Sequence, residues 1–178
     1  MTTYISILRG INVSGKNIIK MEALKRLFES LDFQKVTTYV QSGNVIFSSA
    51  LSDVKKIEKL ITSQIEKDFG LKVPVIILTI AELKQCIEDN PLIKNRDEAF
   101  LHFTFLAERP IDCKKERIKD KKAVNEEIEI SERVVYLYCP NGYGKTKLTN
   151  TFLENTLKVT ATTRNFRTTY KLLKIAEE

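Results

Sequence analysis

Two stretches of the sequence, LKVPVIILTIAELKQCI at 71–87 and LKVTATTRNFRTTYKLL at 157–173, align without a gap. Each predicts a short strand that leads directly into a helix with apolar residues at helical spacing. In the first stretch, Thr79 and Glu82 have the T-x-x-E spacing of a capping box, and the residue aligned with Thr79 is Asn165, which also favours the N-cap position. The alignment therefore predicts an internal repeat in which equivalent residues are 86 positions apart.

The segments around this repeat follow the same order in both halves of the chain. Strand patterns occur at 3–9, 35–41, 44–49 and 73–79 and again at 100–107, 126–131, 133–139 and 160–163. Helical patterns occur at 20–33, 52–70 and 81–89 and again at 113–124, 147–157 and 166–178. This order predicts an α+β protein formed by tandem duplication of a ferredoxin-like βαββαβ unit, with helices packed on the sheets. The predicted organisation is a first half at 1–88, a linker at 89–98 and a second half at 99–178.

The composition is that of an ordinary globular protein. Of 178 residues, 43% are hydrophobic and 29% are charged, which excludes an intrinsically disordered chain. Neither a signal-peptide pattern nor a membrane-spanning apolar run is found, so we expect a cytoplasmic protein. The three cysteines, Cys86, Cys113 and Cys139, form no CxxC pair, which disfavours a disulfide framework or a zinc site. We expect no bound metal and no cofactor.

Four segments of the sequence are distinctive: LRGINVSGKN (8–17), YVQSGNVIFSS (39–49), CPNGYGKTKLTN (139–150) and TTRNFRTTYKLL (162–173). Together they resemble the segments that mark the family called domain of unknown function 1697 (DUF1697), and the resemblance extends from Ile7 to Leu173. It implies a small bacterial α+β protein with two ferredoxin-like halves. It implies no activity, because none is assigned to that family.

The segment CPNGYGKTKLTN lies between a predicted strand and a predicted helix and contains Gly-Lys-Thr at 144–146. A nucleotide-hydrolysing P-loop requires a glycine where this chain has Cys139. It also requires further parallel strands and a strand-end aspartate that binds magnesium, whereas only 32 residues follow Thr146. The segment is therefore not predicted to be a P-loop, although a turn before a helix can still hold an anion on its free amides.

The excess positive charge is concentrated near this segment. Six basic residues and one acid lie between Asn141 and Lys171, while the whole chain has a net charge of +6. If helices begin near Thr146 and Asn165, their amino-terminal ends and the cations beside them are expected to face the same end of the second sheet. This arrangement predicts a phosphate or carboxylate site.

Two loops of the first half are also rich in polar residues that are not acidic. They are predicted at 9–17 and 41–44, and both can be explained either by turn chemistry or by ligand binding. Combined with the second-half cluster, the predicted ligand-binding residues are Arg9, Asn12, Lys16, Asn17, Gln41, Ser42, Asn44, Asn141, Tyr143, Lys145, Lys147, Arg164, Asn165 and Arg167.

The sequence contains few candidates for catalysis. The single histidine, His102, alternates with Leu101 and Phe103 and is interpreted as a strand residue rather than a general base. No catalytic triad, carboxylate pair or metal-ligand spacing is found. The favoured hypothesis is binding of a small anionic ligand through basic, Asn-rich loops.

Two alternatives remain open. One is RNA or single-stranded DNA binding on a ferredoxin-like sheet, with Tyr4, Phe47, Phe103 and Phe105 as the aromatic candidates. The other is an enzyme of unknown reaction. The sequence predicts no membrane association and leaves the oligomeric state undetermined.

Overall fold

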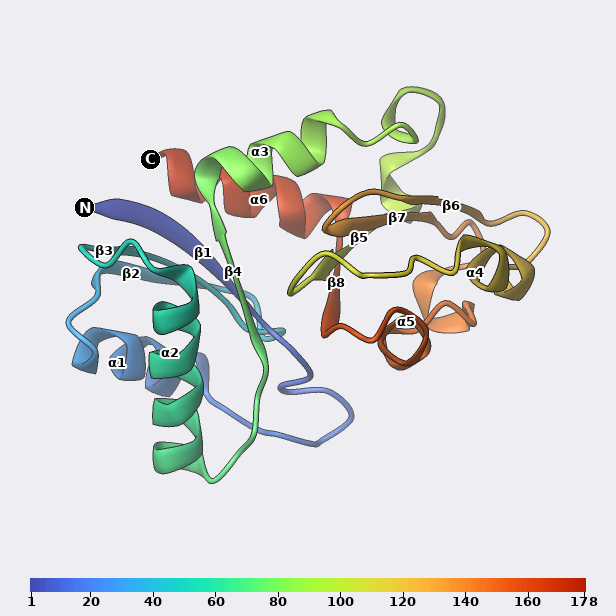
Figure 1. Cartoon of the computed structure of the whole chain (residues 1–178). Coiled ribbons are helices and arrows are strands. Elements are labelled where there is room, and N and C mark those ends of the chain that lie inside the picture. The colour runs from blue at the N-terminus through green and yellow to red at the C-terminus, as the bar shows by residue number, and fades with distance from the viewer. The chain divides into compact units, whose positions relative to one another are not determined.

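The computed structural model describes all residues from 1 to 178. The chain is an α+β protein with two four-stranded antiparallel sheets and six α-helices (Figure 1). It divides into two compact units, one made of Met1–Lys84 together with Leu172–Glu178, the other of Gln85–Lys171. None of the helices is both long enough and apolar enough to span a membrane.

The first unit contains the first sheet, whose strands are in the order β2-β3-β1-β4. The strands are β1 (Thr2–Leu8), β2 (Gln34–Tyr39), β3 (Asn44–Ser49) and β4 (Val75–Thr79). Helices α1 (Met21–Ser30) and α2 (Val54–Phe69) cover one face of this sheet (Figure 1).

The core of the first unit lies between these two helices and the sheet. Helix α1 buries Leu24, Leu27 and Phe28, which have the spacing of one helical face. Phe28 meets Phe47 of the sheet edge to face, with ring centroids 5.3 Å apart. Each fully buried side chain of this size stabilises the fold by roughly 1.5–3 kcal/mol, so these contacts determine which face of the sheet the helices cover.

The second unit contains the second sheet, in the order β6-β7-β5-β8. Its strands are β5 (Leu101–Leu106), β6 (Glu127–Ile130), β7 (Val134–Tyr138) and β8 (Ala161–Asn165). Helices α4 (Lys115–Lys121) and α5 (Asn150–Leu157) contribute Ile118, Leu153 and Leu157 to its core. Numbered within each unit, the strand order is the same in the two sheets.

The aligned repeat corresponds to β4 with helix α3 (Ile80–Glu88) and to β8 with helix α6 (Phe166–Glu177). The two strands begin and end 86 residues apart, as the alignment predicted. The predicted caps are also confirmed. The amide of Glu82 donates to Thr79 Oγ1 at 3.2 Å, and the amide of Thr168 donates to Asn165 Oδ1 at 2.8 Å.

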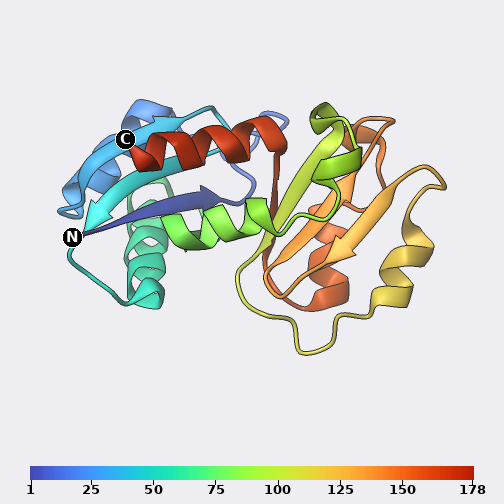
Figure 2. The ribbon, with the colours of Figure 1, turned by 90° about the horizontal axis from the view of Figure 1, so that it is seen from above.

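The boundaries between the two units fall inside these same helices. The boundary in α3 lies between Lys84 and Gln85, and the boundary in α6 lies between Lys171 and Leu172. These two helices are drawn in green and in red in Figure 2. Residues 89–98, predicted as a linker, belong to the second unit; they include the short 3₁₀ helix Ile93–Asn95, and a second one, Glu98–Phe100, begins at their last residue.

One predicted helix boundary is wrong in a way that affects the candidate site. Helix α5 begins at Asn150 with Thr149 as its N-cap, and not near Thr146. Residues Tyr143–Lys145 form a separate 3₁₀ turn, and Thr146 is buried, with its Oγ1 accepting the amide of Leu148 at 3.1 Å. Thr146 thus stabilises the turn before the helix instead of starting the helix.

Candidate functional site

The predicted residues of the first unit gather at the end of the first sheet where β1 and β2 finish and β3 begins. Asn12 joins the loop after β1 to the β2–β3 turn. Its Nδ2 donates to the carbonyl oxygen of Ile19 at 2.9 Å and to that of Gln41 at 2.8 Å, and its Oδ1 accepts the Ile19 amide at 2.9 Å. Both ends of the Asn12 side chain are therefore occupied in holding the loop closed.

Three other predicted residues of this end have similar structural roles. Asn17 Nδ2 donates to the carbonyl oxygen of Gly10 at 2.9 Å. The side chain of Asn44 is fully buried, and its Nδ2 donates to the carbonyl oxygen of Tyr39 at 2.9 Å and to Ser42 Oγ at 3.1 Å. These bonds favour turn chemistry over ligand binding for Asn17, Ser42 and Asn44.

Gly43 lies at the centre of this arrangement. Its φ of +84° is in the region that favours glycine, and a Cβ built on it would lie 2.6 Å from Cδ1 of Ile11. The β2–β3 turn therefore packs directly on the loop after β1. Of the remaining predicted residues, Lys16 and Gln41 are exposed and Arg9 is half-buried.

The predicted residues of the second unit gather at one end of the second sheet. His102 at the start of β5 lies opposite Asn165 at the end of β8, and Leu101 lies opposite Tyr138 at the end of β7. The loop that follows β7 and the start of α6 therefore leave the sheet at the same end. The strand register alone therefore brings the loop after β7 and the start of α6 to the same end of the sheet.

A hydrogen bond brings the start of α5 to the same end. Asn150, the first residue of α5, accepts the hydroxyl of Thr163 at 2.6 Å, and Thr163 Oγ1 lies 2.7 Å from Thr104 Oγ1. Thr163 is two residues before Asn165, the cap of α6. The amino-terminal ends of α5 and α6 consequently lie close together on β8.

His102 is part of this group, although the sequence favoured a purely structural role for it. Its ring stacks on Tyr143, with centroids 4.8 Å apart and an interplanar angle of 22°. Its Nδ1 lies 3.2 Å from the carbonyl oxygen of Phe100. Burial lowers the pKa of His102, and the hydrogen bond to Phe100 opposes this only in part, so the ring is neutral at pH 7.

The predicted cations differ in their placement. Lys145, Lys147 and Arg167 are exposed, whereas Arg164 is buried. Arg164 lies opposite Phe103 on β5 and is adjacent to Asn165 in β8, so the two side chains point to opposite faces of the sheet. Nη1 of Arg164 donates to Thr162 Oγ1 and to the carbonyl oxygen of Thr163. Arg164 was predicted to lie beside Asn165 among the ligand-binding cations, but its burial separates it from the exposed cations Lys145, Lys147 and Arg167.

Asn141 has a local partner. It forms two reciprocal amide hydrogen bonds with Asn125, each of 3.0 Å. This pair joins the loop after β7 to the residues just before β6, which is a structural role.

The sequence did not identify Thr104, Asn150 or Thr163 as site residues. The available signal was the alternation of small polar residues along β8, where Ala161, Thr163 and Asn165 share one face. A core-facing position occupied by threonine indicates a hydrogen-bonded group, since a buried hydroxyl requires a partner.

The remaining reactive groups of this end are not arranged for chemistry. Burial raises the pKa of the Cys139 thiol to about 12, with a smaller contribution from Glu126, which makes it a poor nucleophile. None of the three cysteines forms a disulfide. No group of three or more histidine, cysteine, aspartate or glutamate residues is placed to hold a metal ion.

The four aromatic residues proposed for stacking on nucleic-acid bases are not accessible. The four aromatic candidates Tyr4, Phe47, Phe103 and Phe105 are all buried, with at most 2% of their surface exposed. The burial of these rings removes the main support for RNA binding on a sheet.

Comparison with known proteins gives two findings. A solved structure, described as the conserved bacterial protein SP0830 from Streptococcus pneumoniae, matches with a TM-score of 0.73 over 98% of both chains, at 23% sequence identity. At this identity the likeness concerns the fold alone. No curated protein matches the sequence significantly.

The family described as "Protein of unknown function (DUF1697)" matches residues 1–136. This range includes two of the four distinctive segments, 8–17 and 39–49, while 139–150 and 162–173 lie beyond it. Because the match covers more than half of the 178 residues, the chain belongs to the DUF1697 family.

Proposed function

We propose that this protein is a cytoplasmic, duplicated ferredoxin-like protein whose second unit binds a small anionic ligand. The duplication is supported by the common strand order of the two sheets and by the constant spacing of β4 and β8 along the chain. Anion binding is supported by the group of residues at the end of the second sheet, which we call the β8 end: His102, Tyr143, Lys145, Lys147, Asn150, Thr163, Asn165 and Arg167.

The observation that carries the proposal is the hydrogen bond between Asn150 and Thr163. Because of this bond, two helices of eight and twelve residues begin close to the same point of β8. The first amides of a helix have no partner within the helix and carry the positive end of its dipole. The caps Thr149 and Asn165 each occupy one of these amides, and the others remain available to an anion.

The exposed cations Lys145 and Arg167 would add charge to the amides. Each charge-assisted hydrogen bond to a phosphate or carboxylate contributes roughly 1.5–3 kcal/mol. Arginine supplies a planar pair of donors and lysine a single mobile charge, so the two residues suit a tetrahedral or carboxylate anion.

His102 provides a way to observe binding. Its pKa is lowered in the folded protein, chiefly by burial. An anion bound at the β8 end would favour the protonated ring and would raise the pKa of His102. Titration of the His102 ring protons by NMR, with and without phosphate, measures this change directly.

The main experiment compares melting temperatures at constant ionic strength with phosphate, sulfate and nucleoside monophosphates. We expect stabilisation of the native protein and at least a tenfold loss of affinity for the double variant Lys145→Ala, Arg167→Ala. The matched control is Lys115→Ala with Lys119→Ala on α4, which removes the same charge from exposed positions of the same unit. Equal ligand response in the two double variants, or an unchanged pKa of His102, would rule the proposal out.

A further inference from the structure

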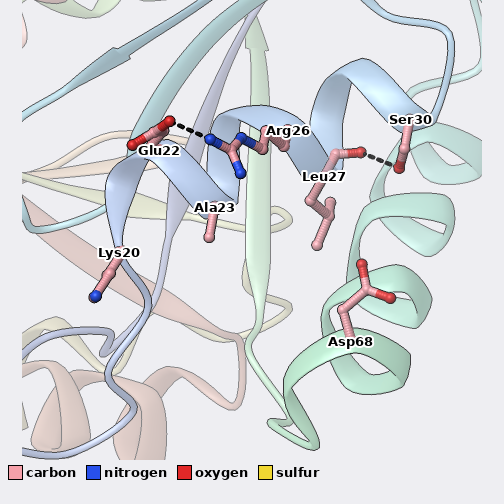
Figure 3. A pocket seen from close by; sticks show the side chains of 7 residues that line it. All are labelled: Lys20, Glu22, Ala23, Arg26, Leu27, Ser30 and Asp68. Atoms are coloured by element: carbon pink, nitrogen blue, oxygen red, sulfur yellow. Dashed lines mark hydrogen bonds and ion pairs between the residues drawn. The ribbon is translucent and has the colours of Figure 1, made fainter.

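The first unit has a groove that the proposed anion site does not use. Its volume is about 460 Å³, and it is lined by Lys20, by five residues of α1 and by Asp68 near the end of α2 (Figure 3). This volume lies within the range of small-ligand sites, roughly 300–1,000 Å³.

Two of the four charged groups in the groove neutralise each other. Arg26 forms an ion pair and hydrogen bond with Glu22, one helical turn earlier on α1. Lys20 and Asp68 form no ion pair. Asp68 accepts the side-chain amide of Gln64 at 2.9 and 3.0 Å, which satisfies hydrogen bonds but leaves the negative charge uncompensated.

These two unpaired charges lie at opposite ends of the groove. In Figure 3, Lys20 is at one end and Asp68 at the other, and the side chains of Ala23 and Leu27 lie between them. A helix rises about 1.5 Å per residue, so the groove from Lys20 along α1 toward Leu27 and Ser30 is roughly 10–15 Å long. The groove thus has a positive end, an apolar middle and a negative end.

We propose that this groove binds a short extended peptide, with a carboxylate of the peptide at Lys20 and an ammonium group at Asp68. A tetrapeptide in extended conformation spans about 13–14 Å, which is comparable to the length of the groove along α1. Small side chains of the peptide would contact Ala23, which is half-buried, whereas Leu27 behind it belongs to the core. The two charges can come from free peptide termini or from side chains within a longer chain.

The probe is Ala-Ala-Ala-Ala with free termini, titrated into the ¹⁵N-labelled protein. We expect amide chemical-shift changes at Ala23, Leu27 and Ser30 that saturate with a millimolar Kd. The acetylated and amidated form of the same peptide has no charges and should bind at least tenfold more weakly. Acetyl-Glu-Ala-Ala-Lys-amide distinguishes the source of the charges, because it binds only if side chains can replace the termini. Absence of saturable shifts with both charged peptides would overturn the proposal.

Charge exchange tests the role of the two ends. Both residues are exposed, so the variants should fold. Lys20→Glu alone should weaken binding at least tenfold, whereas Lys20→Glu combined with Asp68→Lys should restore it, because the peptide can then bind in the reverse direction. The control Lys59→Glu changes the same charge on α2 outside the groove and should leave the Kd unchanged. Failure of the exchanged pair to restore binding would show that the two charges do not hold the peptide.

Discussion

The polar loops at the end of the first sheet and those at the β8 end have similar compositions but different structures. In the first, the amide side chains of Asn12, Asn17 and Asn44 bond to main-chain groups of their own loops. In the second, Lys145 and Arg167 are exposed beside two helix starts. Asparagines within glycine-rich turns therefore use their side chains to bond the main chain of the turn. Cations next to helix starts instead remain accessible to a ligand.

The largest effect is expected for Gly43→Ala at the end of the first sheet. The added methyl group would lie 2.6 and 2.8 Å from two atoms of Ile11, at a φ of +84°. Overpacking and an unfavourable backbone angle together predict a loss of about 2–4 kcal/mol in the free energy of unfolding. The control is Gly142→Ala at the β8 end, where φ is +91° but no atom lies within 4 Å of the added carbon. Equal losses in urea denaturation would show that the two turns are packed alike.

The next effect is expected for Asn12→Ala, which removes three hydrogen bonds between the loop after β1 and its neighbours. We expect the free energy of unfolding to fall by about 2–3 kcal/mol, because the part-buried main-chain amide and carbonyl of Ile19 lose their partners. Asn12→Gly is the matched variant, since glycine tolerates the φ of 54° and isolates the contribution of the side chain. Surface substitutions usually change the free energy of unfolding by no more than about 0.5 kcal/mol. A loss below that value in both variants would show that Asn12 does not hold the loop closed.

A smaller, pH-dependent effect is expected from His102 at the β8 end. Because its pKa is lowered on folding, the unfolded chain takes up the proton first as the pH falls below 6.5. The free energy of unfolding should therefore be highest above pH 6.5 and decrease toward the lower pKa of the folded protein. The His102→Gln variant should show a flatter dependence between pH 7 and pH 5. An identical slope in both proteins would contradict the burial of the imidazole.

The smallest effect is expected for Asn141→Ala. Its paired bonds with Asn125 are solvent-exposed, so water can replace them, and the loss should be below about 0.5 kcal/mol. Urea denaturation beside Asn12→Ala provides the direct comparison. A loss as large as that of Asn12→Ala would mean that asparagine side chains stabilise the loop after β7 as much as the loop after β1.

The sequence predicted the α+β class and most helices and strands because the patterns that indicate them are local. The spacing of Leu24, Leu27 and Phe28 predicts a helix face, and Thr79 and Asn165 indicate helix starts through side chains that bond to nearby amides. Strand order and register depend on residues that are far apart in the sequence. The only sequence pattern that bears on them is the internal repeat.

The site was predicted less well because burial and strand face depend on pairing. Arg164 was predicted to join the other cations beside Asn165, yet its position opposite Phe103 directs it to the other face of β8. The start of α5 was predicted too early: Thr149 caps the helix, and the Thr146 hydroxyl holds the Leu148 amide in the turn before it. The role of Asn12 could not be predicted, because its partner Gln41 is 29 residues away.

The boundary within α6 has a consequence for how the protein is synthesised. The first unit contains residues from both ends of the chain, Met1–Lys84 and Leu172–Glu178. A ribosome makes residues 85–171, which form the second unit, before it reaches Leu172, so the first unit lacks some of its residues until the sequence of the second unit has been made. A stop codon just before Leu172 would remove part of the first unit while leaving the sequence of the second unit whole.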